Sequence, residues 1–325
     1  INYTDQPQAQ DPGGVNYAQA ITDRSSARDR NVSYDAGEAL SQSRLGMVYE
    51  QERTKGNLVV RNYYVTRDFS NKLPFKNGGS VNIDRFFYGL GVQYEFKELL
   101  PEDFSFTVGM DFDRQEDKRK RFDNNSGTLG ALTFDQEEHV SSDGFFAQGR
   151  YDKNKWSIST GIRYDRVTFD TQDRYLANGD DSGKLDFDAV SPSVGVNYEL
   201  DTGILFGNIS SSFETPTTTE LANPDSSGGF NALLKPQKAN NMEIGYKANY
   251  ENLYYEFAIF EIDLKDELTP YELEASPGRT FYSNVGRSSR SGIESAFTWN
   301  VKSNLLVDFS YTWSDFKFDQ FIDQN

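Results

Sequence analysis

Apolar residues occupy every second position in many stretches of this chain of 325 residues. In the clearest stretch, DFSFTVGMDFD (103–113), Phe, Val and Met fill the even positions, and small, polar or acidic residues fill the odd ones. A period of two is typical of a β-strand with one apolar and one polar face. We therefore predict about twelve strands and no helix. The pattern recurs at 86–96, 156–165, 193–200, 242–250 and 305–314, and less clearly at 40–51, 57–69, 144–152, 204–214, 253–264 and 290–300.

The connections between the predicted strands alternate between short and long. Short ones lie at 53–56, 97–102, 152–155, 201–203, 251–252 and 302–304, and long ones run roughly over 70–84, 118–141, 170–190, 215–239 and 265–283. In an up-and-down sheet this order places the short turns at one edge and the long loops at the other, as in an outer-membrane barrel. Aromatic residues near the ends of the apolar faces, such as Trp156 and Tyr164, are typical of interfacial girdles.

A soluble β fold is the alternative. Strands of about ten residues are long for a sandwich, however. A propeller would show a repeated blade motif, and we find none in the sequence.

Composition narrows the function. The chain has a net charge of −17 and a mean hydropathy of −0.70, yet 14% of its residues are aromatic, which suits many strands with aromatic faces. It has no cysteine, and its one histidine, His139, precedes a predicted strand, so most nucleophilic, acid–base and zinc chemistry lacks its usual residues. We expect no enzyme activity and no metal site. A pI of about 4.6 argues against nucleic acid as a partner.

Membrane insertion through helices is not predicted, because no run of 18 or more apolar residues occurs. A barrel strand needs only about 9–11 residues with alternating polarity, so a membrane barrel is compatible with the low mean hydropathy. The chain opens in a loop-like segment, and we expect it to be a fragment of a longer protein.

Five stretches, taken together and in this order, resemble the barrel of TonB-dependent outer-membrane receptors, which import ferric siderophores and similar scarce nutrients. They are DPGG (11–14), STGIRYD (159–165), SPSVGVNYEL (191–200), SSSFETPTTTELANP (210–224) followed by GFNALLKPQKANNMEIGYK (229–247), and FYSNVGRSSRSGIESAF (281–297). The resemblance implies an all-β, transmembrane, up-and-down antiparallel barrel of 22 strands. Residues 1–325 would supply about twelve of these strands as a partial barrel domain without the plug domain.

The resemblance also implies the partners. They are outer-membrane lipid and lipopolysaccharide, the TonB complex reached through the plug, and an iron chelate, all at the outer membrane of a Gram-negative bacterium. No cofactor is expected, since the ferric siderophore is the transported ligand.

Two sets of candidate site residues follow. The polar face would line the lumen, where charges need partners from water or a plug, and Glu294 could pair with Arg290 or with the plug. The lumen-facing residues are Asp111, Arg163, Glu243, Lys247 and Glu294. Ligand contacts are expected from aromatic and basic residues near the long loops, because aromatics bury apolar area and guanidinium groups pair with carboxylate or hydroxamate oxygens. These residues are Phe75, Arg85, Arg121, Phe122, Tyr175, Phe230, Tyr271, Arg279, Phe281 and Tyr282.

Several features keep more than one interpretation. The basic run KRKR (118–121) begins a predicted long loop and could attract an anionic chelate or lipopolysaccharide phosphates, or could simply be solvated. The acidic residues at 180, 181, 186 and 188 could hold Ca²⁺, although a solvated loop is favoured. A passive porin and a soluble carbohydrate-binding or hydrolytic β protein are the rival functions.

Overall fold

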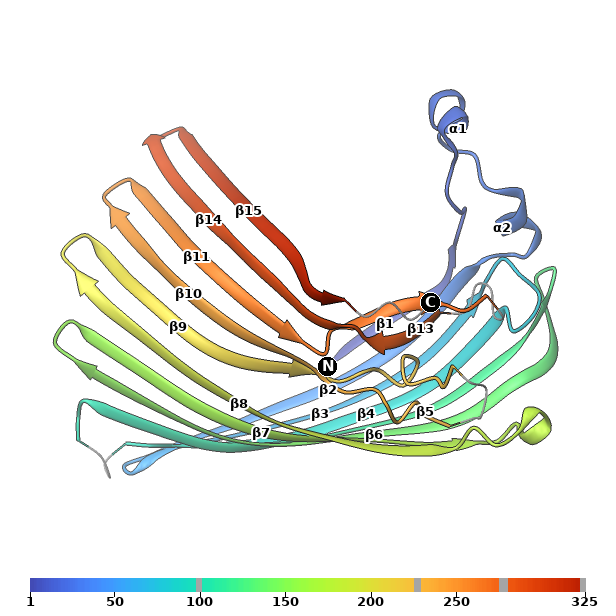
Figure 1. Cartoon of the computed structure of the whole chain (residues 1–325), viewed down its shortest axis with the longest axis horizontal. Coiled ribbons are helices and arrows are strands. Elements are labelled where there is room, and N and C mark those ends of the chain that lie inside the picture. Colours follow the sequence, from blue (N-terminus) through green and yellow to red (C-terminus); the bar gives the residue numbers. More distant parts are fainter. Residues whose placement is uncertain (98–100, 225–228, 275–279, 322–325) are drawn as a thin grey trace.

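The computed structural model describes residues 1–97, 101–224, 229–274 and 280–321. Within these residues, thirteen strands form one antiparallel sheet that follows chain order, except that β14 follows β11, and β12 and β13 form a separate hairpin. The large sheet curves into an open trough (Figure 1). Its strands are β1 (Asn2–Gln10), β2 (Gly37–Arg53), β3 (Gly56–Lys72), β4 (Ser80–Phe96), β5 (Phe104–Asn125), β6 (Thr128–Lys153), β7 (Trp156–Asp173), β8 (Gly183–Leu200), β9 (Gly203–Glu214), β10 (Gln237–Tyr250), β11 (Leu253–Lys265), β14 (Gly286–Lys302) and β15 (Leu305–Phe321).

The apolar positions of neighbouring strands fall on one face of this sheet. Met110 of β5 pairs with Val92 of β4 and Phe145 of β6, and Phe145 pairs with Tyr164 of β7. The side chains of Met110, Phe145 and Tyr164 are exposed, with 47% of Phe145 accessible. Such a broad exposed apolar band fits contact with lipid and confirms the predicted face of DFSFTVGMDFD.

The polar positions face the inside of the trough. Residues 215–224 and 229–236, together with the paired strands β12 (Leu268–Glu272) and β13 (Thr280–Asn284), lie within its curve (Figure 1). Leu221 and Leu234 pack with Phe169 and Phe187, which belong to the polar face of β7 and β8. The polar face is therefore concave and the apolar face convex.

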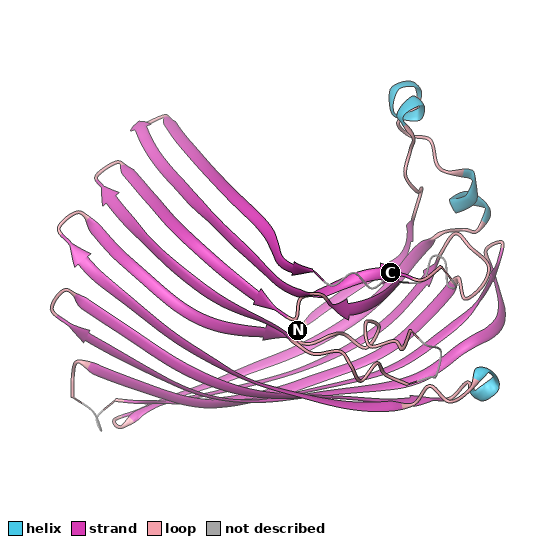
Figure 2. Ribbon diagram, viewed as in Figure 1, coloured by secondary structure: helices cyan, strands magenta, loops and turns pink. Residues whose placement is uncertain are grey.

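The strand count is higher than predicted. β1 was missed because NYTDQPQAQ has almost no apolar residue, and the segment is a strand rather than a loop. Three short helices were also missed, namely α1 (Tyr17–Thr22), α2 (Asp29–Ser33) and the 3₁₀ turn η1 (Leu176–Asn178). Asn16 caps α1 reciprocally with Gln19, a local signal that the search for strand alternation passed over. Figure 2 shows how small this helical share is beside the strands.

The predicted long loop at 118–141 is wrong. β5 and β6 continue through this stretch and join in a two-residue turn at Ser126 and Gly127, which both have positive φ. The alternation of faces persists, but beyond Phe112 both faces are polar, so hydrophobicity no longer marks the strand. His139 consequently lies inside β6 rather than before a strand.

The other connections agree better with the prediction. The short turns at 53–56, 152–155, 201–203, 251–252 and 302–304 join consecutive strands, whereas the predicted loop at 265–283 contains the β12–β13 hairpin. In the part of the chain that the structure describes, no helix has the length and apolar character needed to cross a membrane.

Candidate functional site

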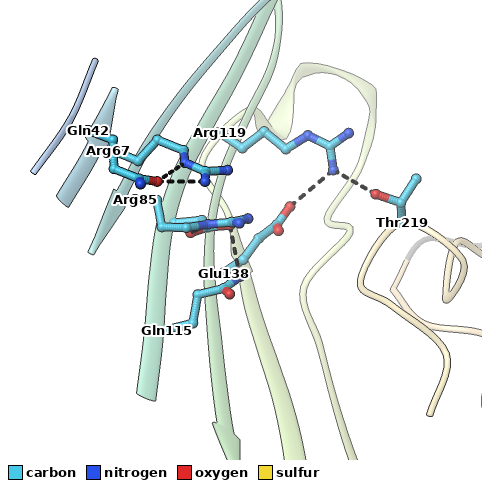
Figure 3. A network of polar contacts seen from close by, with 8 residues as sticks. Gln42, Arg67, Arg85, Gln115, Arg119, Glu138 and Thr219 are labelled. Carbon is cyan, nitrogen blue, oxygen red and sulfur yellow. Dashed lines mark hydrogen bonds and ion pairs between the residues drawn. The ribbon is translucent and has the colours of Figure 1, made fainter. Parts of the chain in front are cut away.

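A row of polar side chains crosses the concave face just beyond the apolar band. Gln42, Arg67, Arg85, Asp117 and Glu138 lie directly opposite one another on β2, β3, β4, β5 and β6 (Figure 3). On β5 and β6 the row lies past Phe112 and Phe145, the last apolar convex residues before charged and polar ones. We call these five residues the polar row.

The register forces like charges together within the polar row. Arg67 faces Arg85, and Asp117 faces Glu138. Directly opposed like charges destabilise a sheet unless each finds another partner. Arg85 donates from Nε to Asp117 Oδ1 at 2.8 Å and from Nη2 to Oδ2 at 2.5 Å, and the Asp117 side chain is almost fully buried. This bidentate pair neutralises the middle of the row.

Arg67 takes a different partner. Its Nε and Nη2 donate to Gln42 Oε1 at 2.8 and 2.6 Å. Gln42 fixes the guanidinium without cancelling its charge, because the amide oxygen is neutral.

Arg119 connects the sheet with the loop after β9. Its Nη1 donates to Glu138 Oε1 at 3.4 Å and to Thr219 Oγ1 at 3.2 Å (Figure 3). The guanidinium carbons of Arg119 and Arg121 lie 5.7 and 5.8 Å from the centre of the Phe134 ring. Two cations thus share one aromatic ring on the concave face.

The loop segment 215–219, which we call the strap, is shaped by its own sequence. Pro216 is fully buried and cannot donate a backbone hydrogen bond to the ladder, so the strand pairing of β9 ends before it. Glu220 Oε2 accepts from the Thr217 N–H at 2.7 Å, and Leu221 N–H donates to the Thr217 carbonyl at 3.0 Å. Leu221 is buried in the apolar cluster beneath, which holds this end of the strap against the sheet.

A cavity of about 360 Å³ lies between the strap and the sheet. Most of its lining residues are polar or charged, and a smaller part of the wall is apolar. The cavity is lined by the strap and by Ile83, Arg85, Gln115, Asp117, Arg119, Glu138, Val140 and Phe169.

The charged residues that line this cavity are two guanidinium groups, of Arg85 and Arg119, and two carboxylates, of Asp117 and Glu138. Arg67 and Arg121 lie next to Arg85 and Arg119 on the same face but outside the lining. Burial raises the pKa of the Glu138 carboxyl above its usual 4.5, and the neighbouring Asp117 adds to the rise, whereas Arg119 opposes it.

The structure separates the residues predicted to touch ligand. Arg85 lines the cavity, Arg121 lies beside it, and Phe230 packs against the buried cluster of Phe169, Phe187, Leu221 and Leu234. Phe281 is only 1% exposed and packs against Tyr271.

The remaining predicted contacts have no common place. Phe75 is exposed after β3, Phe122 lies in β5 near a bulge, Tyr175 precedes η1, and Tyr282 is half-buried in β13. Arg279 lies outside the described residues.

The predicted lumen residues lie on the concave face, and four of the five have a polar partner on another strand of the sheet. Arg163 Nη1 meets Asp111 Oδ2 at 2.7 Å, and Lys247 Nζ meets Glu256 Oε1 at 2.7 Å. Glu243 Oε2 accepts from Asn208 at 2.8 Å. Glu294 is exposed, and Arg290, its expected partner, pairs with Glu267 at 2.9 Å instead. Neighbouring strands thus supply the partners that were expected from water or a plug.

The sequence alone did not indicate Arg67, Arg119, Glu138 or the strap as parts of the site. The basic run KRKR contained a usable signal, because alternation sends Arg119 and Arg121 to one face and Lys118 and Lys120 to the other. No similar signal joins Arg119 to Thr219, since they are 100 residues apart in sequence.

Comparison with known proteins identifies the family. A model of the TonB dependent receptor-like β-barrel matches residues 1–325. A ferrioxamine B receptor of Salmonella typhimurium is 25% identical over 191 residues, which are 57% of this chain and 25% of that protein.

Two solved structures share the fold. The ferric citrate transporter FecA has a TM-score of 0.73 at 16% identity, over 97% of this chain and 48% of its own. The copper transporter OprC has a TM-score of 0.70 at 16% identity, over 87% and 48%. The chain therefore spans about half the length of these two structures. Its match to the ferrioxamine B receptor covers a quarter of that protein. By the match over its whole length, the chain belongs to the TonB-dependent receptor β-barrel family.

Proposed function

We propose that this chain forms part of the barrel wall of an outer-membrane receptor that takes up a ferric siderophore or a similar iron complex. The observation that carries the proposal is the cavity on the concave face, where guanidinium groups and an aromatic residue converge beyond the lipid-facing band. The names of the ferrioxamine B receptor and the ferric citrate transporter support an iron chelate as cargo. The family is one of transport receptors, so no catalytic step is involved.

The two faces of the sheet have different roles in this proposal. The convex band contacts membrane lipid, and the charged convex residues above it meet lipopolysaccharide. The concave face surrounds a plug domain of the complete receptor and presents the cavity to the ligand from outside. Energy for transport comes from the TonB complex, acting on that plug. Neither a resident cofactor nor Ca²⁺ is needed in this scheme.

Uptake by the complete receptor tests the proposal. The receptor is expressed in a host that lacks its own siderophore receptors, and ⁵⁵Fe accumulation is followed with a panel of ferric hydroxamates, ferric catecholates and ferric citrate. We expect at least one chelate to enter, and its entry to stop when TonB is deleted. Uptake that continues without TonB would indicate a passive pore, and no uptake of any chelate would contradict the proposal.

A further inference from the structure

Of the two guanidinium groups that line the cavity, that of Arg119 has more unused hydrogen-bonding capacity than that of Arg85. Arg85 is engaged by both oxygens of buried Asp117, and Arg67 is fixed by Gln42. Arg119 contacts Glu138 and Thr219 through one nitrogen only, at the long distances of 3.4 and 3.2 Å. Its buried Nε has no hydrogen-bond partner among the described residues.

An incompletely satisfied, largely buried guanidinium is costly for the protein to maintain. Arginine offers five N–H donors and always keeps its charge, and buried donors normally find partners. The Arg119 side chain is only 15% exposed and lines the cavity. A planar ligand group with two oxygens would satisfy donors that the protein leaves open.

The surroundings of Arg119 favour a negative occupant. Asp117 is taken up by its bidentate pair with Arg85, so Glu138, at 3.4 Å, is the carboxylate at the cavity that contacts Arg119. Arg67 and Arg121 add two cations on the same face beside the cavity. The strap adds the hydroxyl groups of four threonines around the same space. Hydroxyl groups can donate to anionic oxygens without adding charge.

We propose that the cavity between the strap and the sheet is a subsite for an anionic oxygen group at the periphery of the ligand, with Arg119 as its specificity-determining residue. The group is a carboxylate or a chemically similar oxyanion. It competes with Glu138 and Thr219 for the Arg119 guanidinium. This inference deepens the proposed function and depends on it for the identity of the whole ligand, but not for binding of the oxyanion.

Equilibrium binding to the complete receptor, purified in detergent, tests the subsite with two probes. Ferric citrate is anionic, and ferrioxamine B carries a terminal ammonium group. We expect Arg119→Gln to weaken binding of ferric citrate by about tenfold or more, the value of a charge-assisted hydrogen bond, and to leave ferrioxamine B within about twofold.

A second variant is expected to change the affinity for ferric citrate in the opposite direction. Glu138→Gln removes the competing carboxylate and should tighten ferric citrate, which a merely structural role for the pair would not produce. Arg119→Lys, which keeps the charge and loses the planar fork, should show an intermediate loss. Arg150→Gln is the matched control, because Arg150 pairs with Asp152 at the opposite end of β6.

Equal losses for both chelates, or no loss for either, would overturn the subsite. If the wild-type receptor binds neither chelate, the proposed uptake of these two chelates is contradicted, but the subsite itself is not yet tested. A second measurement then tests the subsite separately. Inorganic phosphate should raise the unfolding temperature of the wild type and of Arg150→Gln more than that of Arg119→Gln. Equal shifts in all three proteins would refute the inference.

Discussion

The contact between Gly109 and Phe146 allows a direct test of the packing on the concave face. Gly109 of β5 pairs with Phe146 of β6, and a Cβ at Gly109 would lie 2.3 Å from Phe146 Cζ and 2.9 Å from the Val92 carbonyl oxygen. Real Cβ contacts are never this short, so Gly109→Ala must displace the ring. The ring also lies beneath the Arg163 guanidinium, whose carbon is 5.8 Å from its centre.

The magnitude follows from overpacking. An extra carbon forced into a filled space costs about 1–3 kcal/mol. Gly46, also on the concave face, is the control, because its Cβ would meet nothing closer than 4.0 Å, at the Asn62 carbonyl oxygen. Gly46→Ala should stabilise by about 0.4–1 kcal/mol through the unfolded chain. The two identical substitutions should therefore differ by roughly 1.5–4 kcal/mol.

Urea unfolding of the complete receptor in lipid vesicles, followed by tryptophan fluorescence, measures the difference. Phe146→Ala removes the ring, so Gly109→Ala should cost less in that background, with a coupling of about 0.5–3 kcal/mol. Phe146→Ala should restore only part of the lost stability, because the Val92 carbonyl oxygen would still lie 2.9 Å from the added Cβ. Equal costs for the two glycines, or no coupling with Phe146, would refute this account.

Three further predictions follow from the faces and from buried polar groups. Met110→Arg places a charge in the lipid-facing band and should cost about 2–4 kcal/mol in vesicle-folding titrations, whereas Thr107→Arg on the concave face should cost much less; equal losses would contradict the face assignment. The native pKa of Glu138 is raised by burial above 4.5, so the folded state binds its proton more tightly, and stability should fall as pH rises from 4.5 through the raised pKa. Glu138→Gln should flatten this dependence in unfolding curves across that pH range, and an unchanged slope would assign the effect to other groups. Buried Asn124 donates to the Tyr34 and Leu73 carbonyls at 2.9 and 3.0 Å. Asn124→Ala should therefore lower the free energy of unfolding by roughly 2–4 kcal/mol and speed limited proteolysis near 126–127. Unaltered cleavage would show that these two hydrogen bonds are not needed for the local structure.

Alternation was enough to predict the sheet wherever one face of a strand is apolar. In 103–113 one face is apolar along its whole length, so the sequence marks both the strand and its orientation. Beyond Phe112 neither face of the strand is apolar. Lys118 to Arg121 still alternate between faces, but both faces are charged, and the strand therefore looks like a loop. β1 was missed for the same reason.

The site was less predictable because it depends on register. Arg85 was predicted as a ligand contact and lines the cavity, but its bidentate pair with Asp117, 32 residues away in sequence, could not be read from the local pattern. Phe281 was chosen as an aromatic anchor, whereas the hairpin buries it as packing. The strap reaches Arg119 across 100 residues. Such contacts arise from the curvature of the sheet and the path of one loop, which local patterns do not encode.

The alternating orientation of residues 118–121 also limits how receptors of this kind can diverge. Deleting or inserting one residue within β5 would exchange the two faces of the strand beyond that point. Lys118 and Lys120 would then turn into the trough, while Arg119 and Arg121 would turn toward the membrane exterior. The strand would keep its composition and charge, but the guanidinium groups of Arg119 and Arg121 would leave the concave face. A change of length within the strand therefore alters every side chain beyond it, whereas a point substitution alters one position on one face.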